Sequence, residues 1–206
     1  MRILIPFKAN NPKSRLSSIL SEEERKELAR LMLLDVIDAA KPFGEIKVVC
    51  PSELDVKGVE VVVDTSDLNT TVNKVMDEAP LAVIMSDLPL LSEEVLKRFF
   101  ETEGDVVVAP GRKGGTNMLL VRKRGFRVSY HFGSFFKHLE MARKMGMKAK
   151  IFDSFYSSVD IDDESDLLEL MMHGSGKKSY EFLRKIGFSV SFEETPRLER
   201  RVFMQP

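Results

Sequence analysis

Residues 81–90, with the sequence LAVIMSDLPL, constrain the fold more than any other part of this 206-residue chain. An apolar run of strand length leads to one carboxylate, Asp87, and then to a proline. Such a run is typical of a strand buried on both faces of a parallel sheet, where ligands bind beyond the carboxyl ends of the strands. We therefore expect Asp87 at the functional edge of a sheet. A turn or helix-capping aspartate is the alternative, and this stretch alone does not decide between them.

Strand and helix patterns alternate along the chain. Further apolar runs predict strands at residues 2–7, 46–50, 59–63, 105–109 and 118–121. Amphipathic patterns between them predict helices, the first of which follows a capping box formed by Ser21 and Glu24. This order indicates a single-domain α/β fold with a mostly parallel sheet and helices on both faces. We assign residues 1–187 to this domain and residues 188–206 to an irregular C-terminal extension of it.

The loop after the first strand is basic. Residues 8–18 contain Lys8, Lys13 and Arg15 and no acidic residue. A long loop at the first crossing from strand to helix more often has a function than serves only as a connection. The donors of Lys and Arg suit the oxygens of a polyphosphate. A solvated basic loop is the alternative, but a position at the same sheet edge as Asp87 favours phosphate binding.

Two aspartates near the end of the chain are candidate metal ligands. Asp160 and Asp162 are two residues apart, so in an extended backbone their side chains point the same way. Two carboxylates on one face repel each other unless a cation lies between them. Mg²⁺ fits, because it takes one or two carboxylates and keeps oxygens from substrate phosphate or water. Helix capping is the alternative role, and we assign it to the next two residues, Asp163 and Glu164.

A second candidate site lies between residues 111 and 134. A glycine-rich turn at residues 111–117 ends in Thr116-Asn117, and its glycines let backbone N–H groups approach an anion. An ordinary hairpin turn is the alternative. Gly133 and Ser134 precede a helical pattern at residues 135–145, where a serine cap would direct free amides and the positive helix end toward a phosphate.

The composition excludes several classes of protein. With 43% hydrophobic residues the chain can bury a substantial core, and 31 basic against 32 acidic residues leave no cationic field for nucleic acid or anionic lipid. No run approaches a membrane span, and the chain begins with a strand pattern rather than a signal sequence. Cys50 is the single cysteine, which we expect to be buried. We therefore expect a cytoplasmic protein.

Two sequence features resemble known binding motifs but do not predict a phosphate-binding loop or a zinc site. Residues 174–179 imitate the end of a phosphate-binding P-loop, but they follow a helix and lack its first glycine, so we expect a turn between helices. His131, His138 and His173 lack the spacing of zinc ligands. His138 is expected in the core or at the surface, although a place near the second candidate site stays open.

Several motifs together carry a family resemblance. They are Lys13-Ser14-Arg15-Leu16, the Asp-Leu-Pro that follows the buried strand, the Gly-Gly-Thr-Asn turn at residues 114–117, Phe132-Gly133-Ser134 with His138 downstream, and the late Asp-x-Asp. In this order the chain resembles, over nearly its whole length, the 2-phospho-L-lactate guanylyltransferase (CofC) family. One departure is that Phe132-Gly133-Ser134 are contiguous, where the family commonly has extra residues.

The resemblance implies a fold, a reaction and a metal. The fold is that of the nucleotidyltransferases of the nucleotide-diphospho-sugar transferase type. The reaction joins 2-phospho-L-lactate to GTP, forming lactyl-2-diphospho-5'-guanosine and pyrophosphate on the route to the deazaflavin coenzyme factor 420. The expected Mg²⁺ ligands are Asp87, Asp160 and Asp162. Lys13 and Arg15 would neutralise the β- and γ-phosphates with help from Lys8.

The acceptor would contact Thr116, Gly133 and Ser134, which match the family's acceptor-binding positions. Phosphoenolpyruvate as acceptor, a cytidylyltransferase of the same fold and a non-catalytic nucleotide-binding module are the alternatives. The sequence also leaves open whether apolar side chains of the C-terminal segment pack on a second copy in a homodimer.

Overall fold

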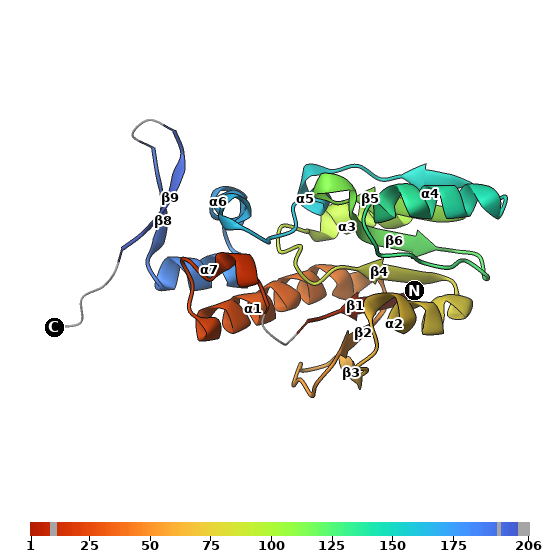
Figure 1. Ribbon diagram of the computed structural model, residues 1–206, viewed down its shortest axis with the longest axis horizontal. Coiled ribbons are helices and arrows are strands. Elements are labelled where there is room, and N and C mark those ends of the chain that lie inside the picture. Colours follow the sequence, from red (N-terminus) through yellow and green to blue (C-terminus); the bar gives the residue numbers. More distant parts are fainter. Residues whose placement is uncertain (9–11, 193–194, 202–206) are drawn as a thin grey trace.

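The chain folds around a seven-stranded sheet with the order β3-β2-β1-β4-β6-β5-β7 (Figure 1). The structure is a computed structural model that describes residues 1–8, 12–192 and 195–201. The strands of this sheet are β1 (Arg2–Pro6), β2 (Glu45–Cys50), β3 (Glu60–Val63), β4 (Leu81–Ile84), β5 (Val106–Pro110), β6 (Thr116–Val121) and β7 (Ala149–Ile151). The α-helices are α1 (Glu22–Ala40), α2 (Leu68–Val75), α3 (Glu93–Glu101), α4 (Ser134–Lys144), α5 (Phe155–Ser158), α6 (Glu164–His173) and α7 (Lys178–Lys185).

The sheet is mostly parallel, as predicted. β1 pairs in parallel with β2 and β4, β2 with β3, and β5 with β7. β6 is antiparallel to both β4 and β5, because the glycine-rich turn returns the chain as a hairpin. That turn closes with Gly111 N–H donating to the carbonyl of Gly115 (2.9 Å). Since β6 lies between β4 and β5, the parallel strands form two groups.

Both faces of the sheet are covered by helices. Along β4 the side chains of Ala82 and Ile84 join a core with α1, α3 and α6. Those of Leu81 and Val83 join a second core with α2 and α4. Every residue of β4 is buried, which explains its continuous apolar sequence.

The first helix begins where its sequence predicts. The Ser21 side chain accepts from Glu24 N–H, and the Glu24 carboxylate accepts from Ser21 N–H, which completes the capping box. α1 has 19 residues, and ten of them are buried. No helix of the described residues is long and apolar enough to cross a membrane.

The buried strand is shorter than its apolar run. β4 ends at Ile84, although Met85 N–H still donates to the carbonyl of Asn117 (3.0 Å). Asp87 follows in a turn, and its carbonyl accepts from Ile161 N–H (3.1 Å). This bond joins the segment that carries Asp87 to the one that carries the late aspartates.

Residues 174–177 form a turn between helices, as expected, and a distant residue explains how the next helix begins. Asp35, buried on α1, accepts from the N–H groups of Lys178 (2.8 Å) and Ser179 (3.0 Å) and from the Ser179 hydroxyl (2.6 Å). Two free N-terminal amides of α7 are therefore satisfied by a carboxylate of another helix.

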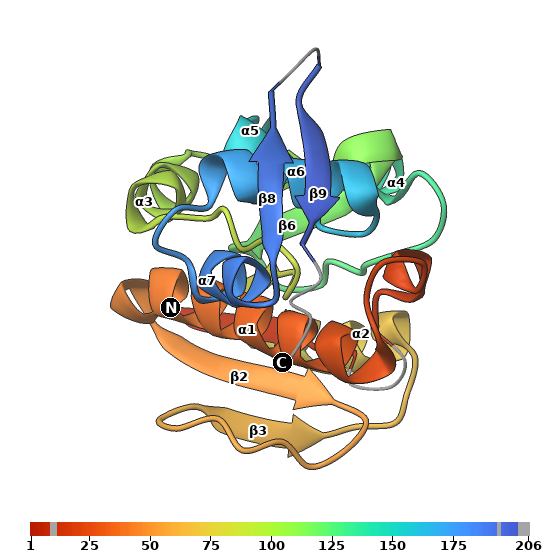
Figure 2. The same ribbon diagram turned by 90° about the vertical axis from the view of Figure 1, so that its left-hand side faces the viewer.

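The expectation of an irregular C-terminal extension is wrong for the described residues. β8 (Phe188–Ser191) and β9 (Arg197–Arg200) pair as an antiparallel hairpin at one end of the molecule, in contact with α6 and α7 (Figure 2). Alternation of apolar and polar residues over 188–191 is a strand pattern, and the partner strand supplies its hydrogen bonds. Phe192, beyond β8, is 72% exposed.

Asp35→Ala should lower the free energy of unfolding by about 3 kcal/mol, because the buried amide and hydroxyl of Ser179 and the part-buried amide of Lys178 lose their acceptor. Urea denaturation measures this. Asp38→Ala is the matched control one turn further along α1, where an exposed carboxylate pairs with Lys178 and Lys41. Its expected cost is below about 1 kcal/mol. Equal costs would contradict the capping role of Asp35.

Candidate functional site

Three cavities meet at the carboxyl ends of the parallel strands, and Asp87 lines all of them. The first, here called the loop cavity, measures about 290 Å³ and lies beside the basic loop. The apolar cavity, about 450 Å³, is lined mainly from the ends of β1 and β2 and the start of α2. The wide cavity, about 660 Å³, extends from Asp87 to the β5–β6 turn and the start of α4. Asp87 is therefore the point where three compartments join.

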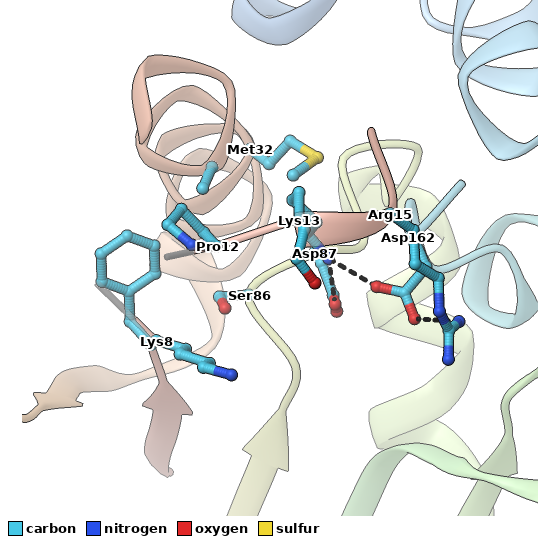
Figure 3. A pocket seen from close by; sticks show the side chains of 11 residues that line it. Lys8, Pro12, Lys13, Arg15, Met32, Ser86, Asp87 and Asp162 are labelled. Carbon is cyan, nitrogen blue, oxygen red and sulfur yellow. Dashed lines mark hydrogen bonds and ion pairs between the residues drawn. The ribbon is translucent and has the colours of Figure 1, made fainter. Parts of the chain in front are cut away.

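Lys13 links the basic loop to two of the predicted carboxylates (Figure 3). Its Nζ lies 2.7 Å from Asp87 Oδ2 and 3.0 Å from Asp162 Oδ1. The Lys13 side chain is only 9% exposed, so the ammonium is held inside the site. Arg15 approaches Asp162 at 3.7 Å and is largely exposed. The structure thus brings together four of the predicted site residues.

The surroundings keep Lys13 charged. Burial opposes its charge, but the nearby carboxylates of Asp87 and Asp162 outweigh burial and raise the pKa of Lys13 above its usual value. Its backbone is left-handed, with φ 53° and ψ 44°, an uncommon conformation for a residue other than glycine.

Asp160 lies beside the same group of charges. It lines the wide cavity with Asp87 and Asp162, and Asn117 donates from Nδ2 to its Oδ1 (3.4 Å). Asn117 Nδ2 also donates to the carbonyl of Ser157 (3.0 Å), which holds the Asp160 segment against β6. Burial, with the added negative charge of Asp87, raises the pKa of the Asp160 carboxyl.

The capping role assigned to Asp163 is confirmed. Asp163 is the N-cap of α6, and its side chain accepts from the N–H groups of Ser165 and Asp166. Glu164 begins the helix as part of an acidic first turn. Asp160 and Asp162 thus stay outside the helix and available to the cavity.

The carboxylates suit a hard cation without forming a finished metal site. Among the described residues, no three acidic, histidine or cysteine side chains are grouped closely enough to bind a metal as they stand. Yet a cation already lies between Asp87 and Asp162, namely the Lys13 ammonium. All-oxygen donors and the raised pKa of Asp160 fit a further positive charge such as Mg²⁺.

The predicted acceptor residues line the wide cavity together. They are Thr116, Gly133 and Ser134. Gly133 is the N-cap of α4 and has φ 68°, a left-handed conformation that favours glycine. The expected capping role of Ser134 is wrong, because Ser134 is already the first helical residue and its hydroxyl bonds to Thr116 Oγ1 (3.2 Å). With the loop before α4 this short, the glycine occupies the cap position.

The expectation of His138 in the core is confirmed, and the structure also places it beside the second candidate site, a position that the sequence had left open. The imidazole is fully buried in the core, and its Nδ1 lies 3.0 Å from Thr116 Oγ1. Burial lowers the pKa of His138 to about 4, so it is neutral at physiological pH. The 22-residue separation from Thr116 gave no local signal of this contact.

Sequence reasoning missed two cations of the glycine-rich turn. Arg112 and Lys113 line the wide cavity. Arg112 pairs with Asp166 at 2.7 Å, and Lys113 lies 3.7 Å from Asp163. These pairs tie the turn to the start of α6. The basic pair between glycines was the available signal, because it resembles the basic loop in composition.

Lys8 is placed where the loop cavity and the apolar cavity adjoin, since it lines both. The rest of the predicted basic loop is described from Pro12 onward, and residues 9–11 lie outside the described residues.

Sequence comparison identifies close relatives. A family model described as "Guanylyl transferase CofC like" matches residues 1–205. A 2-phospho-L-lactate guanylyltransferase from Archaeoglobus profundus is 53% identical over 201 residues, covering 97% of each chain. Another from Ferroglobus placidus is 54% identical over 203 residues, covering 97% of this chain and 100% of the relative.

Solved structures share the fold at low sequence identity. A protein described as a nucleotide-diphospho-sugar transferase from Desulfovibrio desulfuricans is 17% identical with a TM-score of 0.75, covering 89% of this chain and 94% of that chain. A nucleotidyl transferase from Methanothermobacter is 14% identical with a TM-score of 0.53, covering 89% and 98%. These likenesses confirm the predicted fold class.

The depressed pKa of His138 predicts acid sensitivity. Between about pH 6.5 and pH 4 the unfolded chain binds a proton at this residue that the folded chain does not, so stability falls as the pH falls. The expected loss is up to about 3 kcal/mol across this window. Urea denaturation at several pH values should show a shallower slope for His138→Asn. His131→Asn, which removes an exposed imidazole, should keep the wild-type slope; identical slopes for all three proteins would contradict the assignment.

Proposed function

Because this chain belongs to the CofC-like guanylyltransferase family, we propose that it condenses 2-phospho-L-lactate with GTP to form lactyl-2-diphospho-5'-guanosine and pyrophosphate. The observation that carries this proposal is the position of Asp87 where three cavities meet, beside Lys13 and the Asp160–Asp162 pair. A nucleotidyltransferase must hold the base and the triphosphate of its nucleotide and bring the acceptor to the α-phosphorus. Three joined compartments provide room for them.

The reaction is an in-line displacement at phosphorus. A phosphate oxygen of the acceptor attacks the α-phosphorus of GTP, a new P–O–P bond forms, and the bond to the β-phosphate breaks to release pyrophosphate. The acceptor oxygen is already anionic, so the protein need not remove a proton from it. Catalysis is then positioning and charge neutralisation.

The compartments divide the substrates among them. The wide cavity holds the phosphorylated acid near Thr116, Gly133 and Ser134. The apolar cavity receives the base. Its position beside the loop cavity, with which it shares Lys8 and Asp87, supports this assignment. Lys13 and Arg15, with Lys8 nearby, neutralise the β- and γ-phosphates. Lys13 is buried and ion-paired, and Arg15 is largely exposed, so Arg15 is the freer of the two to meet an incoming triphosphate.

Mg²⁺ is part of the proposal. The residues that would hold it are Asp87, Asp160 and Asp162. When bound, it would supply positive charge against the α-phosphate. The role in factor 420 biosynthesis, the cytoplasmic location and the homodimeric state stay predictions.

The test is pyrophosphate release from four nucleoside triphosphates, each paired with phospholactate and with phosphoenolpyruvate, in the presence of Mg²⁺. We expect turnover with GTP and phospholactate. A preference for phosphoenolpyruvate would replace the acceptor, and a preference for CTP would replace the nucleotide. Nucleotide binding without pyrophosphate release in any pairing would overturn the enzymatic proposal.

Asp87→Asn should abolish Mg²⁺-dependent turnover while the protein stays folded, because the amide keeps the shape of the side chain and loses its charge. Asp160→Asn and Asp162→Asn should reduce turnover in the same direction. Asp38→Asn is the matched control, since this exposed aspartate also pairs with a lysine but lies outside the cavities. Unchanged activity of Asp87→Asn, or of the wild type in excess chelator, would contradict the metal assignment.

Arg15→Ala should weaken GTP binding about tenfold while leaving GMP binding nearly unchanged, because only the β- and γ-phosphates lose a charged partner. Calorimetric titration with both nucleotides measures the difference. Arg30→Ala is the control, because Arg30 is partly exposed and pairs with Glu27 on α1. Equal weakening of GTP and GMP binding would move the contact of Arg15 to the α-phosphate or the base.

A further inference from the structure

One ring nitrogen of His138 has its protonation state fixed by the backbone. Ser129 N–H donates to His138 Nε2 at 3.0 Å. A backbone amide can only donate, so Nε2 carries no proton. The other nitrogen of a neutral imidazole must then carry it, and Nδ1–H donates to Thr116 Oγ1 (3.0 Å).

The surroundings hold His138 in this neutral form. Its ring is fully buried and faces the rings of Tyr130 and Phe126, with centroids 5.0 and 6.1 Å away. Protonation at Nε2 would place a second N–H against Ser129 N–H in an apolar setting. The lowered pKa of His138, about 4, agrees with this.

The hydroxyls of Thr116 and Ser134 then have one proton left to donate. The pair has two O–H protons, and the bond between the two oxygens (3.2 Å) uses one of them, whichever hydroxyl is the donor. The pair cannot donate to His138, because His138 is itself a donor there. The second proton is therefore left for the wide cavity, which both residues line. The opposite tautomer would accept from Thr116 and leave oxygen lone pairs facing the cavity.

We propose that His138 is a positioning residue, whose fixed tautomer makes the Thr116–Ser134 pair donate a hydrogen bond to an anionic oxygen of the acceptor. The inference rests on the proposed function for the identity of the acceptor, but not for the direction of the hydrogen bonds. A hydroxyl donor attracts a phosphate or carboxylate oxygen, whereas two lone pairs would repel it. His138 acts through Thr116 and does not touch the acceptor itself.

The tautomer can be measured without any substrate. Nitrogen-15 NMR of the imidazole distinguishes a protonated Nδ1 from a protonated Nε2. We expect protonated Nδ1 and bare Nε2 between pH 6 and pH 8. A protonated Nε2 would overturn the inference, whatever reaction the protein catalyses.

A double-mutant cycle tests whether His138 acts through Thr116. Thr116→Val and His138→Gln should each raise the KM for phospholactate about tenfold, with kcat and GTP affinity nearly unchanged. Gln keeps an acceptor for Ser129 but offers no donor where Nδ1 lies. The double variant should be no worse than the worse single variant. Additive effects would show that His138 contributes only packing and would overturn the inference.

The His138→Asn variant tests whether the hydrogen-bond donor at position 138 or the packing of its side chain determines the KM. The Asn side chain can place an N–H where Nδ1 lies, but it fills less of the space beside Phe126 and Tyr130. If polarity matters, Asn should restore the KM toward the wild-type value. If only packing matters, Asn should be at least as damaging as Gln. If the Gln variant fails to fold, the KM of the Asn variant decides: a value near that of the wild type supports the inference, and a clearly raised value overturns it.

Failure of the proposed function would be visible separately. If the wild type releases no pyrophosphate from GTP and phospholactate, the proposed function falls. Binding of inorganic phosphate to the same four proteins of the cycle then tests the donor directly. Non-additive weakening of phosphate binding supports the inference, and unchanged binding in Thr116→Val and His138→Gln overturns it.

Discussion

The ion pairs of Lys13 with Asp87 and Asp162 determine how the site is assembled. They join the loop after β1, the turn after β4 and the segment before α6 at one buried ammonium. Burying such a charge is costly, and the two carboxylates offset this cost. The same pairs place a cation between two of the carboxylates of the site.

The order of the sheet makes this meeting possible. β1 and β4 are neighbours in parallel, so the segments that follow them emerge at the same edge. The β5–β6 hairpin brings Thr116 and Asn117 to that edge from the opposite chain direction. Asn117 then fixes the Asp160 segment, while Thr116 meets α4 through His138 and Ser134. Charged groups thus gather around Lys13, while Thr116, Ser134 and His138 form a neutral hydrogen-bonded group on the other side of the junction.

This division matches the chemistry expected of the two sides. Carboxylates and cations surround the place proposed for the triphosphate and metal, where charge must be neutralised. Two hydroxyls, a helix start and a neutral imidazole surround the place proposed for the acceptor. A neutral His138 suits that role, because protonation would remove its hydrogen bond with Ser129 and weaken the fold.

The sequence by itself determined what depends on neighbouring residues. The apolar run before Asp87, the capping box at Ser21 and the capping role of Asp163 follow from local spacing, and the fold class follows from their order. Only the tertiary structure decided which distant groups meet: Lys13 and Asp162 are 149 residues apart, and Asp35 caps a helix 144 residues away. Periodicity tells which face of a strand or helix is buried, but hydrogen-bond partners and their donor direction depend on strand order and on exact distances. That is why Ser134 was misassigned as a cap and why the hydrogen-bond partners of His138 were not predicted.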